Sequence, residues 1–253
     1  MTPETTVNAP APGNFFSRLM GVYFSPGETF KDIGRTPKIL VPLIILAVVV
    51  GSTFTLAVHQ AGLENIMHKQ MDPLVEKGWM PQEQADKAIQ QAKANPTVAY
   101  VRTGLTQGIT AIIVALIVAG IFKLISMVIG TENSFKQILS VTLFTSLALW
   151  LVYAVIAVFL LYLQNPEDID ANSPVSSNLG AILGLITDKK SLPGFVKGFA
   201  AFIDVFSIWK IALLSIGYAV VSTKAKISTV AIWLSVLYLL AALVFSPLIG
   251  MFM

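Results

Sequence analysis

The sequence predicts an all-α integral membrane bundle of five transmembrane helices, with amphipathic helices before the first span and an extramembrane helical hairpin after it. The 253 residues are 55% hydrophobic and only 12% charged, with a mean hydropathy of +0.74, whereas soluble domains average about 25% charged residues. Apolar runs of helix length recur along the chain, and about 20 such residues cross the hydrocarbon core of a bilayer. We therefore expect one membrane bundle rather than separate soluble domains.

Charge and residue usage argue against several function classes. The formal net charge of +3 is dispersed, so we expect no nucleic-acid partner. The chain has no cysteine, which excludes disulfides and cysteine metal sites. It also has no glycine-rich phosphate loop and no Ser/His/Asp arrangement, and both histidines lie early in one polar connection. We expect a protein that is not an enzyme and that has neither a cofactor nor a metal site.

The first residues of the chain differ from the rest. Residues 1–14 are rich in Pro, Thr and Ala and have no apolar period, so we interpret them as a disordered tail rather than a signal peptide. In the segment FFSRLMGVYF that follows, large apolar groups including Phe15 and Phe16 surround a single Arg18. It is too short to span a bilayer. Two interpretations stay open: an amphipathic helix in the headgroup plane, or a short helix packed under the bundle.

A second short helix is predicted to begin at Ser25. Serine is a typical N-cap residue, Pro26 suits the first helical position, and Glu28 stands where a capping box places its acidic side chain. Together with Phe30, these residues complete an interfacial N-terminal segment that we assign to residues 15–38.

The first span is predicted at residues 39–58, and a long polar connection, 59–103, follows it. Apolar residues recur at helical spacing on both sides of Pro81, which indicates a helical hairpin outside the membrane. Glu64 and His68 are four residues apart on one helical face, as in half of a metal site. A complete site needs three or four ligands, and no second pair accompanies them, which favours a solvated face.

The second and third spans are predicted at residues 104–129 and 137–163. Lys123 lies near enough to the end of the second span to extend its ammonium to the interface. The second span also has a stripe of small residues that favours close helix packing: Ala111, Ala115 and Ala119. The third span has no charge and offers four hydroxyls that either reach Asp204 or Lys210 on a neighbouring helix or bond to their own backbone: Ser140, Thr142, Thr145 and Ser146.

A second polar connection, 164–194, precedes the fourth span. Three carboxylates open it: Glu167, Asp168 and Asp170. They lack the alternating spacing and glycine turn of a calcium loop, so a solvated loop is the favoured interpretation. Residues 181–186 are apolar but too short to span, and we expect them at the surface. The fifth span, 227–250, is uncharged.

The fourth span, 195–221, has Asp204 and Lys210 near its middle. Ionisable residues at bilayer depth are typical of functional sites. Six residues of separation correspond to about 9 Å of rise and side-chain directions roughly 120° apart, so the two do not pair directly. Ser207 lies between them, and we expect an intramembrane polar cluster of Asp204, Ser207 and Lys210. This cluster either fixes the packing of the bundle, lines a substrate or proton path, or binds a partner.

Three segments resemble a known family. FFSRLMGVYFSPGETFKDIGRTPKILVPLIIL is similar to the opening of the bacterial branch of the Yip (Ypt-interacting protein) domain family. GTENSFKQILSVTLFTSLALWLV and DVFSIWKIALLSIGYAVV are similar to the third and fourth spans of that family. The resemblance implies a five-span membrane domain over residues 39–253, and its eukaryotic members bind small GTPases and help to organise membrane traffic and curvature.

Five spans place the two ends of the chain on opposite sides of the membrane. The basic residues of the two sides tie in number, but those on the amino-terminal side are denser directly beside the spans, which favours a cytoplasmic amino terminus. The resemblance implies the same orientation. We expect a protein of the bacterial inner membrane with its amino terminus in the cytoplasm and its carboxyl terminus outside.

Two functions fit the sequence. The first is a non-enzymatic membrane scaffold, or membrane-organising protein, that binds other proteins or shapes the bilayer through its interfacial amino-terminal helices. The second is a small transporter or channel that uses Asp204 and Lys210. The expected partners are the lipid bilayer and other membrane or membrane-associated proteins, with a homo-oligomer as an open alternative.

Overall fold

The computed structural model describes residues 12–171, 173–187, 192–222 and 225–250, and all regular structure within them is helical. The disordered tail predicted for residues 1–14 lies outside the described residues over 1–11. The helices are α1 (Phe15–Phe24), α2 (Pro26–Arg35), α3 (Leu40–Ala61), α4 (Leu63–Glu76), α5 (Gln82–Ala94), α6 (Pro96–Ile129), α7 (Phe135–Leu161), α8 (Leu179–Ile186), α9 (Gly194–Phe202), α10 (Val205–Val221) and α11 (Ile227–Gly250).

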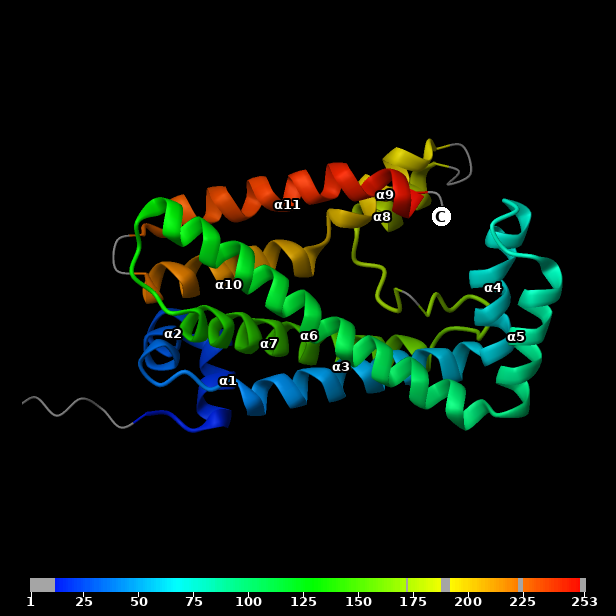
Figure 1. Ribbon diagram of the computed structural model, residues 1–253, viewed down its shortest axis with the longest axis horizontal. Helices are drawn as coiled ribbons and strands as arrows, with labels where there is room; N and C mark the ends of the chain where they lie inside the picture. The colour runs from blue at the N-terminus through cyan, green and yellow to red at the C-terminus, as the bar shows by residue number, and fades with distance from the viewer. Residues whose placement is uncertain (1–11, 172, 188–191, 223–224, 251–253) are drawn as a thin grey trace, which may run out of the picture.

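The long helices run along the long axis of the molecule (Figure 1). Four of them, α3, α6, α7 and α11, are long and apolar enough to cross a membrane, and α10 is a shorter apolar helix. Figure 1 shows α1 and α2 at the end of the bundle where α7 begins and α10 ends, and the α4–α5 hairpin at the opposite end. The all-α membrane bundle predicted from composition and apolar runs is confirmed.

The fourth predicted span is divided into α9 and α10, which the apolar pattern did not indicate. Helix α9 packs against the end of α11, where Gly198 approaches the Ser246 carbonyl and Gly194 approaches the backbone of Gly250. The Phe202 carbonyl accepts a hydrogen bond from Tyr238 of α11, and α10 continues along the same helix. Helices α9 and α10 therefore both pack along α11 and together form one interrupted span.

Helix α7 lies at the centre of the bundle, and every residue from Ile138 to Leu149 is buried. Its Thr142 hydroxyl lies 2.6 Å from the hydroxyl of Tyr218 of α10, whose ring stacks on Phe122 of α6 at 3.9 Å between centroids. Outward-facing positions of the bundle are apolar instead, as on the exposed face of α6 at Ile109 and its neighbours. This distribution is the one expected when lipid surrounds the helices.

Close backbone contact between α3 and α6 depends on glycine. Gly104 of α6 lies against the backbone of Gly51, and Gly108 lies against the carbonyl of Ala47. A Cβ atom at Gly51 would lie 2.5 Å from the Gly104 carbonyl oxygen, so a larger residue there would force the helices apart. The predicted alanine stripe of α6 continues this small-residue face, with Ala115 and Ala119 buried in the core and Ala111 packed against it.

The hairpin predicted between the first two spans is present as α4 and α5. Lys93 of α5 binds Glu64 of α4 at 2.8 Å, and this hydrogen bond lowers the pKa of the Glu64 carboxyl. His68 instead lies 3.2 Å from Asp72. Glu64 and His68, weighed above as half of a metal site, therefore have different partners.

Candidate functional site

The amino-terminal hairpin of α1 and α2 is held by Arg18, whose side chain is only 2% exposed. Its Nε donates to the Asp32 carboxylate at 2.8 Å and its Nη1 to the Thr36 carbonyl at 2.8 Å. Nη2 donates to the Asp32 carbonyl at 3.3 Å and to the Thr36 hydroxyl. The Asp32 carboxylate also accepts a hydrogen bond from the backbone N–H of Gly13. The Arg18 side chain therefore stabilises the hairpin from within and is not placed to contact lipid headgroups.

The start of α2 differs from the predicted capping box. Pro26 occupies the first turn, as expected, but the Ser25 side chain makes no capping hydrogen bond. Ser25 also ends α1, where its N–H donates to the Gly21 carbonyl, and this shared position fixes its backbone in a conformation unlike that of an N-cap. Glu28 is exposed and pairs with Lys31 at 3.2 Å.

Helix α1 packs on the bundle with one face and exposes apolar side chains on the other. Phe15 packs against Phe144 of α7, and the Tyr23 hydroxyl donates to the Ala148 carbonyl at 2.5 Å. Burial raises the pKa of Tyr23, so the hydroxyl stays protonated as a donor. On the outer face, one apolar stripe at four-residue spacing is 73%, 52% and 78% exposed in turn: Phe16, Met20 and Phe24. The inner face of α1 is therefore packed against the bundle, and its outer apolar face is left exposed.

Helix α2 is part of the bundle core. Phe30 is fully buried and its ring lies where a side chain at Gly217 of α10 would stand. Gln137 of α7 donates to the Gly34 carbonyl at 2.9 Å, and the Ser140 hydroxyl bonds the backbone of Lys38 just after the helix. The amino-terminal hairpin therefore has a fixed place on the membrane domain.

A second polar site lies at the interruption between α9 and α10. Asp204 caps α10, because its carboxylate accepts the backbone N–H groups of Phe206 and Ser207 at 2.8 and 3.2 Å. The same carboxylate accepts the hydroxyl of Ser177 from the loop before α8. The Ser207 hydroxyl lies 2.8 Å from the hydroxyl of Tyr238 of α11, which also bonds the Phe202 carbonyl. Asp204 and Ser207, predicted as neighbours, therefore share one hydrogen-bonded network.

Lys210 lies outside this network. Lys210 is half-buried as a residue, and within the described part of the chain its ammonium has no hydrogen bond or ion pair. None of the four α7 hydroxyls reaches Asp204 or Lys210: Ser140 and Thr142 bind elsewhere, and the buried hydroxyls of Thr145 and Ser146 have no partner among the described residues.

The sequence did not predict the hydrogen-bond partners of Arg18 or of Asp204. Nothing local marks Asp32 and Thr36 as ligands of Arg18, since both are ordinary residues of a short polar helix. Ser177 and Tyr238 come from a loop and a helix far along the chain from Asp204. Three His, Asp or Glu side chains placed to hold a metal ion do not occur together among the residues described.

Comparison with protein families matches the Yip1 domain over residues 20–246. The chain belongs to the Yip1 domain family. Comparison with curated proteins and with solved structures found no match. The matched region of the Yip1 domain begins within α1 and ends within α11, so it includes the interrupted span, Asp32 and the α4–α5 hairpin, whereas Arg18 lies just before it.

Proposed function

We propose that this Yip1-domain protein is a non-enzymatic scaffold of the bacterial inner membrane that organises the bilayer through α1, with its amino-terminal end in the cytoplasm. The observation that best supports this function is the apolar stripe of Phe16, Met20 and Phe24, which is exposed although α1 is fixed to the bundle by Arg18 and Phe15. A rigidly held apolar face suits insertion into one leaflet beside the bundle.

The energy available from such insertion is considerable. Complete burial of one large apolar side chain contributes about 1.5–3 kcal/mol. Since three side chains are between half and four-fifths exposed, the stripe would contribute on the order of 4–5 kcal/mol on entering acyl chains. Because only one leaflet receives this added volume, α1 would act as a wedge and favour curved membrane.

The charged face of α2 gives the same end of the molecule a second contact surface. Lys31 and Arg35 are exposed there, next to a polar groove lined by Ser17, Glu28 and Asp32. Basic side chains beside a membrane attract anionic headgroups and acidic segments of other proteins. We expect protein partners to bind on this side.

The test compares vesicle remodelling and copurification for the full chain and for Phe16→Ser/Phe24→Ser. Deleting residues before the first span would be a poor test, because it also removes Phe30 from the core. Wild-type protein should convert large vesicles to smaller or tubular ones, and the double variant should lose this effect while remaining monodisperse. Lys87→Ala, which removes an exposed cation of α5 at the opposite end of the bundle, is the control and should retain it. Equal remodelling by the double variant would refute the wedge.

The orientation has its own experiment, made simple by the absence of native cysteine. Single cysteines at Lys31 and at Lys87 stand at opposite ends of the bundle and are both exposed. A membrane-impermeant maleimide added to intact cells should label the Lys87→Cys variant and spare Lys31→Cys. The reverse pattern would invert the proposed topology.

A second candidate function, transport of protons or small ions, is favoured by one observation. Asp204 stands at an interruption of an apolar segment, where its carboxylate caps the start of α10. Asp204→Asn retains a side-chain oxygen for the cap but removes the charge, so the fold should persist. Loss of flux from reconstituted vesicles with unchanged thermal stability would support transport, and unchanged flux would exclude Asp204 from any path.

A further inference from the structure

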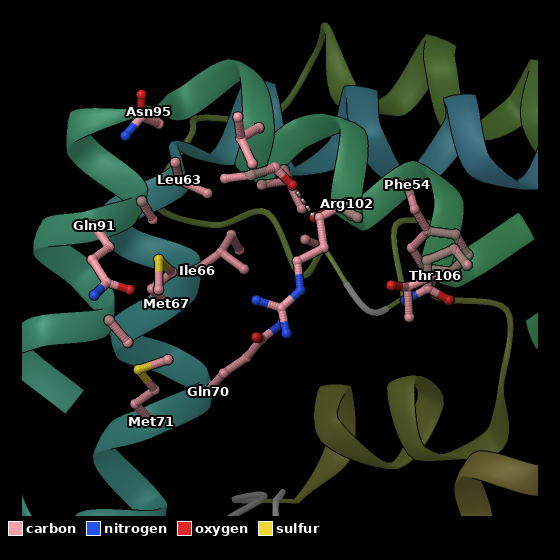
Figure 2. A pocket seen from close by; sticks show the side chains of 18 residues that line it. Phe54, Leu63, Ile66, Met67, Gln70, Met71, Gln91, Asn95, Arg102 and Thr106 are labelled. Atoms are coloured by element: carbon pink, nitrogen blue, oxygen red, sulfur yellow. Dashed lines mark hydrogen bonds between the residues drawn. The ribbon is translucent and has the colours of Figure 1, made fainter. Parts of the chain in front are cut away.

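The connection that follows α7 turns back into the bundle instead of staying outside it. Its first part passes under the α4–α5 hairpin, where Ile66, labelled in Figure 2, packs with Ile169 in one buried apolar cluster. Farther on, the Val175 N–H donates to the Tyr153 hydroxyl at 3.3 Å. Tyr153 lies eight residues before the last residue of α7, which is about 12 Å inside that end of the helix. The chain has therefore returned into the bundle before α8 begins.

Helix α8 leads the chain outward again, along α9. Figure 1 shows the two helices together at the carboxyl end of α11. The Leu179 N–H donates to the Ile203 carbonyl at 2.7 Å, which joins the start of α8 to the end of α9. Gly180 lies against Ala200, since a Cβ atom at Gly180 would stand 3.7 Å from the Cβ of Ala200. Both contacts show that α8 and α9 are antiparallel.

The depth of α8 follows from the contacts that α9 makes with α11. Gly198 of α9 lies against the Ser246 carbonyl of α11. Gly180 of α8 is level with Ala200, two residues after Gly198. Because α8 and α9 run in opposite directions, Ile182, two residues after Gly180, is level with Gly198. Ile182 is therefore also level with Ser246, which belongs to a helix long and apolar enough to cross a membrane.

The outer surface of α8 is apolar and open. Between Asn178 and Thr187 the helix has the sequence LGAILGLI, which includes no polar side chain. Among the described helices it packs mainly on α9, so Ile182 is 56% and Ile186 is 76% exposed. Phe245, next to Ser246 on α11, is exposed to a similar extent. Large apolar side chains on two different helices are therefore exposed at one depth.

We propose that α8 is a re-entrant helix that inserts into the leaflet at the carboxyl end of α11 and binds acyl chains through Ile182 and Ile186. Lipid that covers Phe245 on the outside of α11 reaches Ile182 at the same depth. Backbone can enter lipid only when its polar groups are satisfied internally. Helix α8 meets this requirement at its start, because the Asn178 side chain accepts the Ala181 N–H at 3.0 Å.

This insertion does not depend on the α1 wedge, which lies at the opposite end of the bundle (Figure 1). It also changes the topology of the connection between α7 and α9, which the sequence predicted as a polar loop with an apolar segment at the surface. In the proposed arrangement, that connection enters the membrane region from the outer end and leaves it through α8.

The experiment measures depth by spin labelling of the full chain, which has no native cysteine. Ile182→Cys and Ile186→Cys are labelled with a nitroxide and reconstituted into vesicles of phosphatidylethanolamine and phosphatidylglycerol. Collision with oxygen, which concentrates among acyl chains, is compared with collision with a water-soluble nickel chelate. Phe245→Cys and Leu248→Cys, two exposed positions of α11, are the matched controls in lipid, and Lys87→Cys on α5 is the control in water.

Ile182→Cys should match Phe245→Cys, with a ratio of oxygen to nickel collision severalfold above that of Lys87→Cys. Ile186→Cys should give a lower ratio than Ile182→Cys, because it lies four residues, or about 6 Å, farther outward along α8.

Three results would overturn the proposal. Nickel collision at both α8 positions as frequent as at Lys87→Cys would place the helix in water. Infrequent collision with both reagents would mean that protein, such as a second copy of the chain, covers α8. Equal ratios at Ile182→Cys and Ile186→Cys would mean that α8 lies flat in the headgroup plane and does not enter the leaflet.

Discussion

The buried ion pair of the amino-terminal hairpin allows a quantitative prediction. Arg18→Met keeps the length of the side chain but removes four hydrogen bonds and leaves the Asp32 carboxylate with the Gly13 N–H. Removing one partner of a fully buried pair costs about 3–5 kcal/mol. Because Asp32 is 26% exposed and water reaches it, we expect a smaller cost of about 2–3 kcal/mol.

Hydrogen exchange is the appropriate assay, because it reports local opening of the hairpin separately from unfolding of the whole bundle. A loss of about 2–3 kcal/mol corresponds to roughly 30- to 150-fold faster exchange of the α1 and α2 amides. Lys31→Ala removes an exposed pair with Glu28, which contributes about 0–1 kcal/mol, so it should accelerate exchange less than about fivefold. Arg18→Lys should recover only part of the protection, because an ammonium cannot reproduce the guanidinium geometry.

If Arg18→Met exchanged no faster than Lys31→Ala, the buried pair would not hold the hairpin, and packing of Phe15 and Phe30 would have to suffice. A double-mutant cycle with Asp32→Asn separates the contribution of the ion pair from that of side-chain packing. The coupling free energy between Arg18 and Asp32 should exceed about 1 kcal/mol.

Three further predictions concern other parts of the molecule. Asp204→Ala removes the α10 cap and should cost about 1–2 kcal/mol, seen as a lower melting temperature, whereas an unchanged melting temperature would mean that the cap is dispensable. Gly198→Val places a side chain where the Ser246 carbonyl stands and should sharply reduce the yield of monodisperse protein; a normal yield would show that α9 can separate from α11. The hydrogen bond from Lys93 lowers the pKa of the Glu64 carboxyl, so this ion pair should stabilise the hairpin at neutral pH and lose its effect as pH falls through the lowered pKa. Exchange of the α5 amides should therefore accelerate on acidification more in wild type than in Lys93→Gln, and equal acceleration in both would show that the pair does not stabilise the hairpin.

The bundle could be predicted from sequence because each span is defined by its own residues. The predicted 39–58 and 227–250 match α3 and α11 within a few residues, since length and hydropathy are local properties. The predicted hairpin also appears, because its apolar period is local. Only α6 begins well before its predicted span, since Pro96 starts a helix in the polar connection and membrane crossing is not required for its first turns.

The interruption before α10 could not be predicted, because its cause is distant in sequence. The run from 195 to 221 is apolar enough for one helix, and nothing local separates a capping Asp204 from an intramembrane one. The chain breaks there because Asn178 forms a bridge with Asp204 and the Leu179 N–H binds the Ile203 carbonyl at 2.7 Å. These contacts satisfy the backbone groups that the break exposes.

Basic residues near the membrane differ in whether the chain itself binds their charge. Arg18 binds Asp32, and Lys123 binds oxygens of the connection between α6 and α7, so their charges are balanced or solvated by the chain and need no ligand. Lys210 of α10 has no such partner in the described residues. A cation in an apolar setting is costly unless something stabilises it, so we expect lipid, water or a transported ion to stabilise Lys210. Flux measurements at the interrupted span therefore address a cation whose charge the described part of the protein does not bind.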